Sequence, residues 1–558
     1  MVSNPVPGNS AYDAIIVGGG HNGLAAAAYL AKAGRSVLLL ERLEQSGGAA
    51  VSAQAFDGVD ARLSRYSYLV SLLPQQIIDD LGLRIRLERR RYSSYTPDPL
   101  DSRRGLLIDN ADADATAVSF AAVGASEDDY SAFTGLYAGC RRLTEALWPT
   151  LTAPLPTRSE ARILAVRAGA EEAWDAMVEH PVGEAIAGSL RHDLVRGVVL
   201  TDALIGTFAR AGDADLQQNI CFLYHLIGGG SGDWDVPVGG MGAVSGELER
   251  AAREAGAVIR TSAEVTAVGP EGVVRYQHDG TEHTATAAWV LANVAPVVLD
   301  RLRLRDQEAT GVVTAGAGRN PNHLREGAQV KVNLLLTRLP RLLDPGVSPE
   351  AAFGGTFHIN ETWSQLDAAY LAAAAGTIPD PLPCEIYCHS LTDPSILSPA
   401  LQAAGVHTLT VFGLHVPDRL ITADNNERRR AELQAAVLKS LNSVLAEPIE
   451  DLLLTGPDGQ PCIETKTTLD IERAVGMPRG NIFHGGLDWP FAEDDAPLGT
   501  PAQRWGVQTD DPRILICGSG ARRGGAVSGI GGHNAAMAVL ESGPPVAGTL
   551  KTGQTPQG

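Results

Sequence analysis

A glycine-rich turn between an apolar strand and a helix constrains this chain more than any other feature. Residues 14–17 are wholly apolar and partly β-branched, as is typical of a central parallel strand covered on both faces. Gly18, Gly20 and Gly23 follow at once, with the spacing that allows a tight turn, close approach to a pyrophosphate and close helix packing. The helix expected from Asn22 to Ala33 would aim its free N–H groups at the phosphates. The segment predicts a Rossmann-type dinucleotide-binding unit.

A second strand ends on an acidic residue. Residues 36–40 are largely apolar and Glu41 follows them, about 20 residues after the glycines, where a carboxylate can accept both hydroxyls of an adenosine ribose. Glu41 also argues against a ribose 2′-phosphate at this position. In a chain with 61 glycines the glycine pattern alone is weak evidence for a dinucleotide-binding unit. The order of strand, turn, helix, strand and acidic residue is specific evidence for one.

Arg42 and the sequence Gly47-Gly48-Ala49 come directly after this unit. The glycine pair offers bare backbone to a ligand. Acid, arginine and glycine pair together resemble the two-part FAD signature of the flavin amine oxidases and phytoene desaturases. The resemblance implies that the dinucleotide is FAD rather than NAD.

Over nearly its full length the chain resembles the phytoene dehydrogenase-related branch of the FAD-dependent oxidoreductases. The matching segments are residues 20–23, 64–73, 239–244 and 517–520, the last with its glycine-rich continuation. The resemblance implies an α/β fold, in which a Rossmann-type FAD-binding domain is interleaved with an α+β substrate domain. It also implies an enzyme that removes hydride from a C–H bond of a small or lipid-like substrate and passes electrons to oxygen, a quinone or another acceptor.

The resemblance further implies that Val265 contacts the adenine through its backbone, and that residues 527–530 lie along the pyrimidine edge of the flavin. We expect the cofactor to be bound by residues from all three glycine-rich regions. They are Gly18, Gly20, His21, Asn22, Gly23, Glu41, Arg42, Gly47, Gly48, Ala49, Val265, Gly518, Val527, Ser528 and Ile530. Cys517 lies inside an apolar strand, so we expect a buried, inert thiol and non-covalent FAD.

The predicted domains are discontinuous. We assign residues 1–71, 227–299 and 504–542 to the FAD-binding domain, and residues 72–226 and 300–503 to the substrate-binding domain. Residues 543–558 are rich in Gly, Pro and Thr, which predicts a disordered tail.

Two arginines depart from the family pattern. Where the family commonly has Thr-His-Pro-Gly after Gly-Ser-Gly, this chain has Ala521, Arg522, Arg523 and Gly524. One hypothesis is that Arg522 or Arg523 binds an anionic group of the substrate. The alternative is a contact to a cofactor phosphate or a surface salt bridge.

Hydride transfer to a flavin needs no protein nucleophile, so the protein has only to orient the substrate and supply a base. His225 and Tyr66 are the first candidates for that role, followed by Tyr68 and His484. Each of these residue types is also common as a packed aromatic or a hydrogen-bonded core histidine.

Composition excludes several classes. A net charge of −20 argues against a nucleic-acid partner. There is no apolar run of membrane-spanning length and no signal-peptide pattern, so we expect a cytoplasmic protein, with peripheral membrane contact left open. The six cysteines include no CxxC pair, which excludes a disulfide reductase. Cys384, Cys388 and His389 form one short cluster without a distant second pair, and we predict no metal.

Three alternatives stay open. Amine oxidation is the nearest alternative reaction for this fold, although the sequence shows no evident aromatic pair near the C-terminal glycines that could surround an amine. A flavin-dependent isomerase is a second. The third is a non-enzymatic prenyl-protein binding module of the Rab GDP-dissociation inhibitor type, which does not use FAD; the intact Gly18, Gly20, Gly23 and Glu41 argue against it.

Overall fold

The computed structural model describes residues 11–310 and 325–543, and segments far apart in the sequence meet in its first sheet. In that seven-stranded sheet, β1 (Ala11–Val17) lies between β2 (Val37–Leu40) and β12 (Thr281–Ala292), all parallel. β9 (Val258–Arg260) extends the sheet beyond β2, and β18 (Ile514–Ile516) pairs with the end of β12. The antiparallel strands β10 (Ala263–Val268) and β11 (Val273–His278) complete it.

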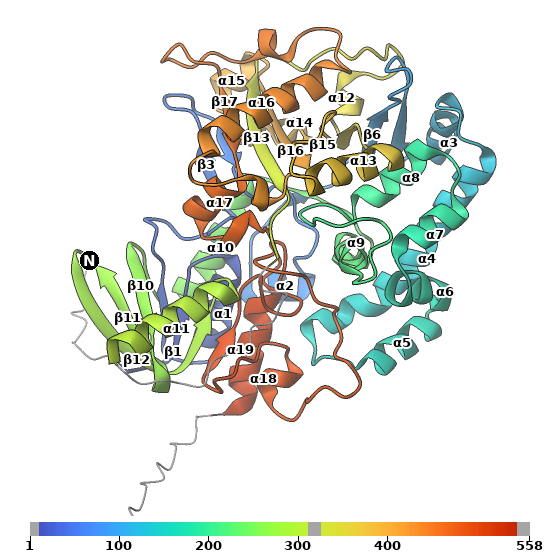
Figure 1. The fold of residues 1–558 in the computed structure, drawn as a ribbon. Coiled ribbons are helices and arrows are strands. Elements are labelled where there is room, and N and C mark those ends of the chain that lie inside the picture. Colours follow the sequence, from blue (N-terminus) through green and yellow to red (C-terminus); the bar gives the residue numbers. More distant parts are fainter. Residues whose placement is uncertain (1–10, 311–324, 544–558) are drawn as a thin grey trace, which may run out of the picture.

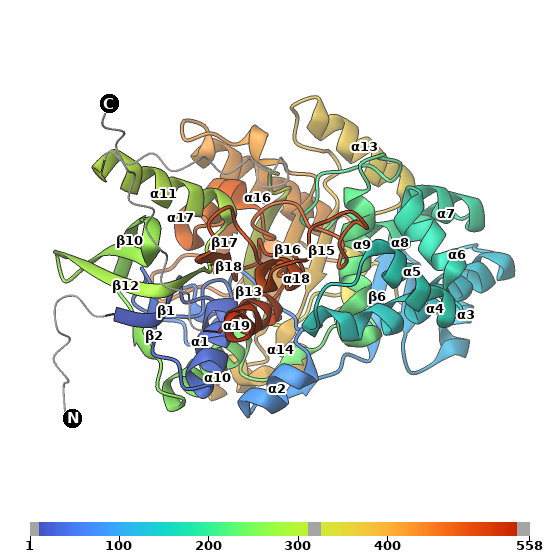
Figure 2. The ribbon, with the colours of Figure 1, turned by 90° about the horizontal axis from the view of Figure 1, so that it is seen from below.

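Both faces of β1 are buried, as its apolar sequence predicts. Ala14 and Ile16 pack in one core, beneath α1 (His21–Lys32), α10 (Met241–Glu254) and α19 (Ile530–Ser542). Ile15 and Val17 pack on the other face with β10, β11 and α11 (Pro296–Thr310). Figure 1 shows α1 and α19 beside this sheet, and Figure 2 shows the same layers from below.

A second seven-stranded sheet forms most of the remaining β structure. Its order is β17 (Ile463–Lys466), β13 (Gln329–Leu336), β16 (His407–Leu414), β15 (Cys384–Tyr387), β14 (Thr356–Ile359), β6 (Tyr92–Pro97) and β7 (Gly105–Asp109). All neighbours are antiparallel except β14 and β6. The helix α16 (Asn426–Asn442) covers one face through Leu433, Val437 and Leu441.

A helical region lies beside the second sheet in Figure 1. Its helices are α3 (Ala113–Ala122), α4 (Glu127–Leu147), α5 (Arg158–Arg167), α6 (Glu171–Trp174), α7 (Val182–Ser189), α8 (Asp193–Thr201) and α9 (Gln217–Ile227). The remaining elements are α2 (Gln75–Leu81), α12 (Pro349–Ala352), α13 (Trp363–Ala374), α14 (His389–Thr392), α15 (Pro399–Ala403), α17 (Thr468–Val475), α18 (Pro501–Arg504), β3 (Ser52–Gln54), β4 (Arg62–Ser64), β5 (Leu87–Glu88) and β8 (Val236–Pro237).

The expected fold class, an α/β nucleotide-binding unit interleaved with an α+β unit, is the one observed. All three segments assigned to the FAD-binding domain contribute strands to the first sheet. The exact domain boundaries stay a prediction, since Val59 and Leu63, assigned to the first domain, pack against Leu335 and Val406 of the second. The predicted tail lies outside the described residues, apart from Gly543. Across residues 11–310 and 325–543, no helix is both long and apolar enough to cross a lipid bilayer.

Candidate cofactor and substrate site

A cavity of about 360 Å³ lies where β1, β2 and β12 end, at the carboxyl edge of the first sheet. This edge is where open α/β sheets bind ligands. Thirteen of the residues predicted from sequence line the cavity: Gly18, Gly20, His21, Glu41, Arg42, Gly48, Ala49, Tyr66, Tyr68, His225, Val265, His484 and Val527.

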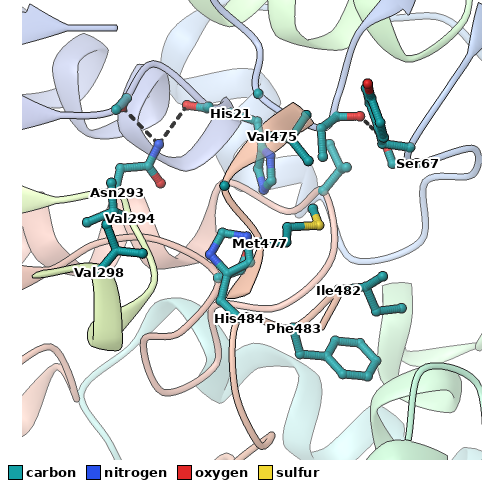
Figure 3. Close-up of a pocket in the computed structure, with 18 of the residues that line it drawn as sticks. His21, Ser67, Asn293, Val294, Val298, Val475, Met477, Ile482, Phe483 and His484 are labelled. Carbon is teal, nitrogen blue, oxygen red and sulfur yellow. Dashed lines mark hydrogen bonds between the residues drawn. The ribbon is translucent and has the colours of Figure 1, made fainter. Parts of the chain in front are cut away.

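The glycine turn is too crowded for side chains. A Cβ on Gly23 would lie 2.4 Å from the Gly18 carbonyl oxygen, and one on Gly20 would lie 3.1 Å from Asn293 Nδ2. The Asn293 amide donates to the carbonyls of Gly18 at 2.9 Å and Gly20 at 3.3 Å, as Figure 3 shows. Asn293 therefore orders the turn. Sequence analysis did not single it out, although a polar residue directly after the apolar end of β12 is a usable signal.

The two glycine motifs meet in space. The Gly47 N–H donates to the Gly19 carbonyl at 2.8 Å, and Gly20 and Gly47 form an isolated parallel bridge. A Cβ on Gly48 would lie 3.1 Å from the Cα of Gly20. The second glycine pair thus extends the bare backbone wall that begins at the first turn.

Glu41 is 6% exposed at the end of β2. Its carboxylate accepts from the backbone N–H groups of Gly19 at 2.7 Å and Leu43 at 2.9 Å, which fixes it beside the turn. Arg42 donates instead to the Ala474 carbonyl at 3.1 Å, so it ties this edge to α17. Val265 lies at a β-bulge, where a register shift frees backbone groups from the ladder.

The amino end of α1 opens on the cavity without a side-chain cap. Nε2 of the buried His21 and Oδ1 of the buried Asn22 have no hydrogen-bond partner among the described residues. Burial lowers the pKa of His21 to about 4, and the neighbouring His484 acts in the same direction. In Figure 3 the imidazoles of His21 and His484 lie on the same side of the cavity. Free helix N–H groups and bare glycine backbone fit the phosphates of a dinucleotide.

The predicted cofactor residues that do not line the cavity hold its walls together. The Ser528 hydroxyl accepts from the Ile530 N–H at 3.2 Å at the start of α19. Asn22 Nδ2 donates to the Gly524 carbonyl at 3.2 Å, which links α1 to the C-terminal glycine segment. A Cβ on Gly518 would lie 3.1 Å from Asn293 Oδ1, so this glycine leaves room for the asparagine.

Arg522 and Arg523 do not line this cavity. Arg523 is buried, and its guanidinium donates to the carbonyls of Thr150 at 2.6 Å, Ala153 at 2.7 Å and Trp505 at 3.0 Å. Arg522 donates to the Phe491 carbonyl. Both side chains therefore have main-chain acceptors, and this geometry gives neither a contact to the cofactor region nor support for the anion-binding hypothesis.

His225 lies in the last turn of α9, and its Nδ1 donates to the Cys221 carbonyl at 2.8 Å. Burial lowers its pKa to about 4, so the imidazole is neutral near pH 7 and its Nε2 is the acceptor of that tautomer. Tyr66 lines the cavity between Arg65 and Lys466, whose charged groups lie 6.0 and 5.9 Å from its ring centre. Burial raises the pKa of Tyr66, so it is protonated near pH 7.

A second cavity of about 280 Å³ adjoins the first. Tyr68, Leu69, Ile205, His225 and Trp234 line both, so these residues form a junction between the two cavities. Beyond the junction the wall includes titratable groups: Arg89, Arg90, Arg141, Asp202, Asp233, Asp235, His358 and Glu385. Sequence reasoning missed this wall because its residues come from distant segments that share no motif.

Aromatic rings and acids shape the second cavity. Tyr68 packs on Tyr387 with ring centres 4.4 Å apart and on Phe412 at 4.8 Å. Burial raises the pKa of Asp202 to about 7. Burial, and secondarily the charge of Asp202, raise the pKa of Glu385 above its usual range. The cavity is therefore aromatic on one side and acidic on another.

All six cysteines are buried, and none lines the first cavity. Burial raises the pKa of the Cys517 thiol, which lies in the core beneath α19. These cysteines consequently offer no thiolate to a cofactor in the cavity, in keeping with non-covalent binding.

Known proteins resemble this chain in sequence and fold. A family model described as an NAD(P)-binding Rossmann-like domain matches residues 16–75. The Mycobacterium tuberculosis protein Rv0897c is 58% identical over 535 residues, which cover 95% of this chain and 97% of that protein. Pyridine nucleotide-disulfide oxidoreductase domain-containing protein 2 of Rattus norvegicus is 29% identical over 570 residues, covering 95% of this chain and 93% of that protein.

Among solved structures, a putrescine oxidase with a redesigned cofactor-binding site superimposes with a TM-score of 0.54 at 17% identity, covering 96% of this chain and 100% of the other. At 17% identity this similarity shows only that the two proteins share a fold. The comparisons confirm the expected fold class.

Proposed function

We propose that this chain, which belongs to the same family as the mycobacterial protein Rv0897c, is an FAD-dependent dehydrogenase or desaturase of the phytoene dehydrogenase-related type. It would remove hydride from a C–H bond of a small or lipid-like organic substrate. The observation that carries the proposal is the junction: a cavity built from dinucleotide-binding elements shares Tyr68, His225 and Trp234 with a second cavity in which a substrate can lie.

FAD, when bound, accepts hydride from the substrate and passes the electrons to oxygen, a quinone or another acceptor. The residues that would bind FAD are those of the first cavity. The amino end of α1 and the glycine turn would hold the pyrophosphate, Glu41 would bind the adenosine ribose, and backbone groups at the Val265 bulge would contact the adenine.

The junction residues would orient the substrate and exclude water. Tyr68 and Trp234 supply flat apolar surface beside the reacting carbon. The neutral imidazole of His225 is held by Cys221, so its Nε2 is available to take a proton from the substrate. Tyr66 lies on the wall of the first cavity and would help to fix the ring system of the cofactor.

Anaerobic reduction of the flavin tests this proposal. Alkenes, alcohols, cyclic ketones and amines are added separately to the oxygen-free protein, and bleaching of the flavin absorbance identifies the substrate class. We expect His225→Gln to keep its flavin but to slow bleaching at least 100-fold, the effect of losing a positioned base. The matched control is His283→Gln, on β12 and outside both cavities. Flavin that no class of substrate reduces, in a fully loaded protein, would contradict the proposal.

Amine oxidation is a second candidate, and the lining of the second cavity favours it. The Tyr68–Tyr387 pair and the nearby Asp202 form the kind of aromatic and acidic surroundings that bind an organic cation. Bleaching by amines, with no effect of alkenes or alcohols, would select this reaction.

A further inference from the structure

Three acidic or imidazole side chains meet on adjacent strands at the wall of the second cavity. His358 on β14 lies directly opposite Glu385 on β15 in the antiparallel register, so their side chains share one face of the sheet. Glu361 follows β14 two residues after the strand ends. One ligand atom from each of the three residues lies within 4.8 Å of the others, and their exposed fractions are 5%, 1% and 1% for His358, Glu361 and Glu385.

The carboxylates of this cluster have no directly bonded cation among the described residues. In the described part of the chain, no lysine or arginine forms an ion pair with Glu361, Glu385 or the neighbouring Asp202. The charge of the buried Arg90 acts on Asp202 and Glu385, but its guanidinium donates to the Trp234 carbonyl and the Thr356 hydroxyl rather than to a carboxylate. Burying a charged carboxylate without a partner is unfavourable in free energy, so each of these carboxylates must either bind a cation or be protonated.

Glu361 points most clearly to a missing ligand. Neither of its carboxylate oxygens has a hydrogen-bond partner among the described residues. The Thr201 hydroxyl, which lies close to both carboxylates, has one proton and donates it to Glu385 Oε1 at 3.3 Å. The two oxygens of Glu361 are thus free to bind an ion.

The other two side chains are held with one atom aimed at the centre of the cluster. Thr96 Oγ1 lies 3.2 Å from His358 Nδ1, so a ring that donates there presents the lone pair of Nε2. The Tyr387 hydroxyl donates to Glu385 Oε2 at 3.1 Å. His358 Nε2 and Glu385 Oε1 are then 3.9 Å apart, too far for a hydrogen bond. Two ligands of one ion, each about 2.1 Å from it at the tetrahedral angle, are about 3.4 Å apart, so binding would draw these two atoms about 0.5 Å closer together.

We infer that His358 Nε2, Glu361 and Glu385 bind one divalent transition-metal ion, of the Zn²⁺ or Mn²⁺ class. One imidazole nitrogen and two carboxylates suit such ions, and a charge of +2 balances the two glutamates. His358 and Glu385 line the second cavity and Glu361 does not, so the ion would lie in the wall of that cavity. The sequence predicted no metal in this chain, and this inference departs from that prediction. Cys384, Cys388 and His389, the one cluster weighed from sequence, are not the residues that form this site.

Metal binding to the FAD-loaded full-length protein tests the inference. After dialysis against EDTA, Zn²⁺ and Mn²⁺ are titrated separately by isothermal calorimetry, and bound metal is counted by elemental analysis. We expect one ion per chain, with Glu361→Gln weakening binding at least 100-fold. Asp235→Asn is the matched control, because Asp235 lines the same cavity outside the cluster and should leave binding unchanged.

Wild-type protein that binds neither ion would overturn the inference and would mean that the carboxylates are protonated instead. Binding that survives Glu361→Gln would also overturn it, because the ion would then lie elsewhere. If that variant does not fold, the wild-type stoichiometry and His358→Gln decide. Flavin content and bleaching are recorded on the same samples, so failure of this inference is distinguishable from failure of the proposed function.

Discussion

Replacing Gly23 with alanine adds one methyl group and should raise the dissociation constant for FAD markedly. Gly23 is the third residue of α1, and its new Cβ would lie 2.4 Å from the Gly18 carbonyl oxygen and 2.7 Å from Asn293 Nδ2. Van der Waals contact needs roughly 1 Å more than the shorter of these distances. The start of α1 must therefore move away from the turn by about that amount.

A helix end displaced by about 1 Å loses the alignment of an N–H group with a phosphate. One hydrogen bond to a charged group contributes about 1.5–3 kcal/mol, so the dissociation constant for FAD should rise about 10- to 100-fold. Gly246→Ala in α10 is the matched control, since its Cβ would meet nothing within 4 Å. Helix propensity alone should stabilise that variant by up to about 1 kcal/mol without a change in FAD affinity.

Quenching of flavin fluorescence on titration of FAD into flavin-free protein measures both constants, and thermal unfolding checks that each variant is folded. Wild-type FAD affinity in folded Gly23→Ala would refute the role assigned to the turn. Equal losses in both variants would also refute it, because the effect would then not depend on the close contact.

Three further predictions follow from the surroundings of the cavity. Arg523→Met leaves the carbonyls of Thr150, Ala153 and Trp505 without their donor and should lower the free energy of unfolding by about 3 kcal/mol or more. Substrate KM should not change; a raised KM at unaltered stability would restore the anion-binding hypothesis. Asn293→Ala removes both side-chain bonds to the turn and should raise the dissociation constant for FAD about tenfold, measured by the same titration; unchanged affinity would contradict its ordering role. Burial lowers the pKa of His415 from 6.5 to about 4. As the pH falls, the unfolded chain therefore binds a proton at His415 before the folded protein does. The contribution of His415 to the free energy of unfolding is complete above pH 6.5 and is lost between pH 6.5 and pH 4. In His415→Asn the acid-induced loss of stability over that range, from urea unfolding at several pH values, should shrink by about 3 kcal/mol; an unchanged loss would contradict the burial argument.

The parts of the fold that could be predicted from sequence are those encoded by contiguous residues. Gly18, Gly20 and Glu41 lie within one strand–helix–strand unit, so local spacing was sufficient to place them at one cavity. The helix α19 begins at Ile530, within the C-terminal glycine-rich segment. Gly531 and Gly532 weaken the helical pattern, yet a Cβ on Gly532 would lie 1.9 Å from the Asn22 carbonyl, so packing of α19 on α1 requires glycine there.

The candidate substrate site was less predictable. Arg522 and Arg523 are close to the C-terminal glycines in sequence, but sequence proximity does not give the direction of a side chain, and both turn to main-chain carbonyls. His358 and Glu385 become neighbours only through the pairing of β14 with β15. Long-range strand pairing of this kind leaves no local spacing signal in the chain.

The flavin content of the purified protein tests the central claim most directly. The protein is denatured with acid, the precipitate is removed, and the supernatant is analysed for flavin by chromatography and absorbance. The account predicts about one FAD per chain, all of it released, because FAD is bound non-covalently at this type of dinucleotide site. A colourless protein that releases no FAD and takes up none when FAD is added would contradict the account, and would favour a binding module without redox activity.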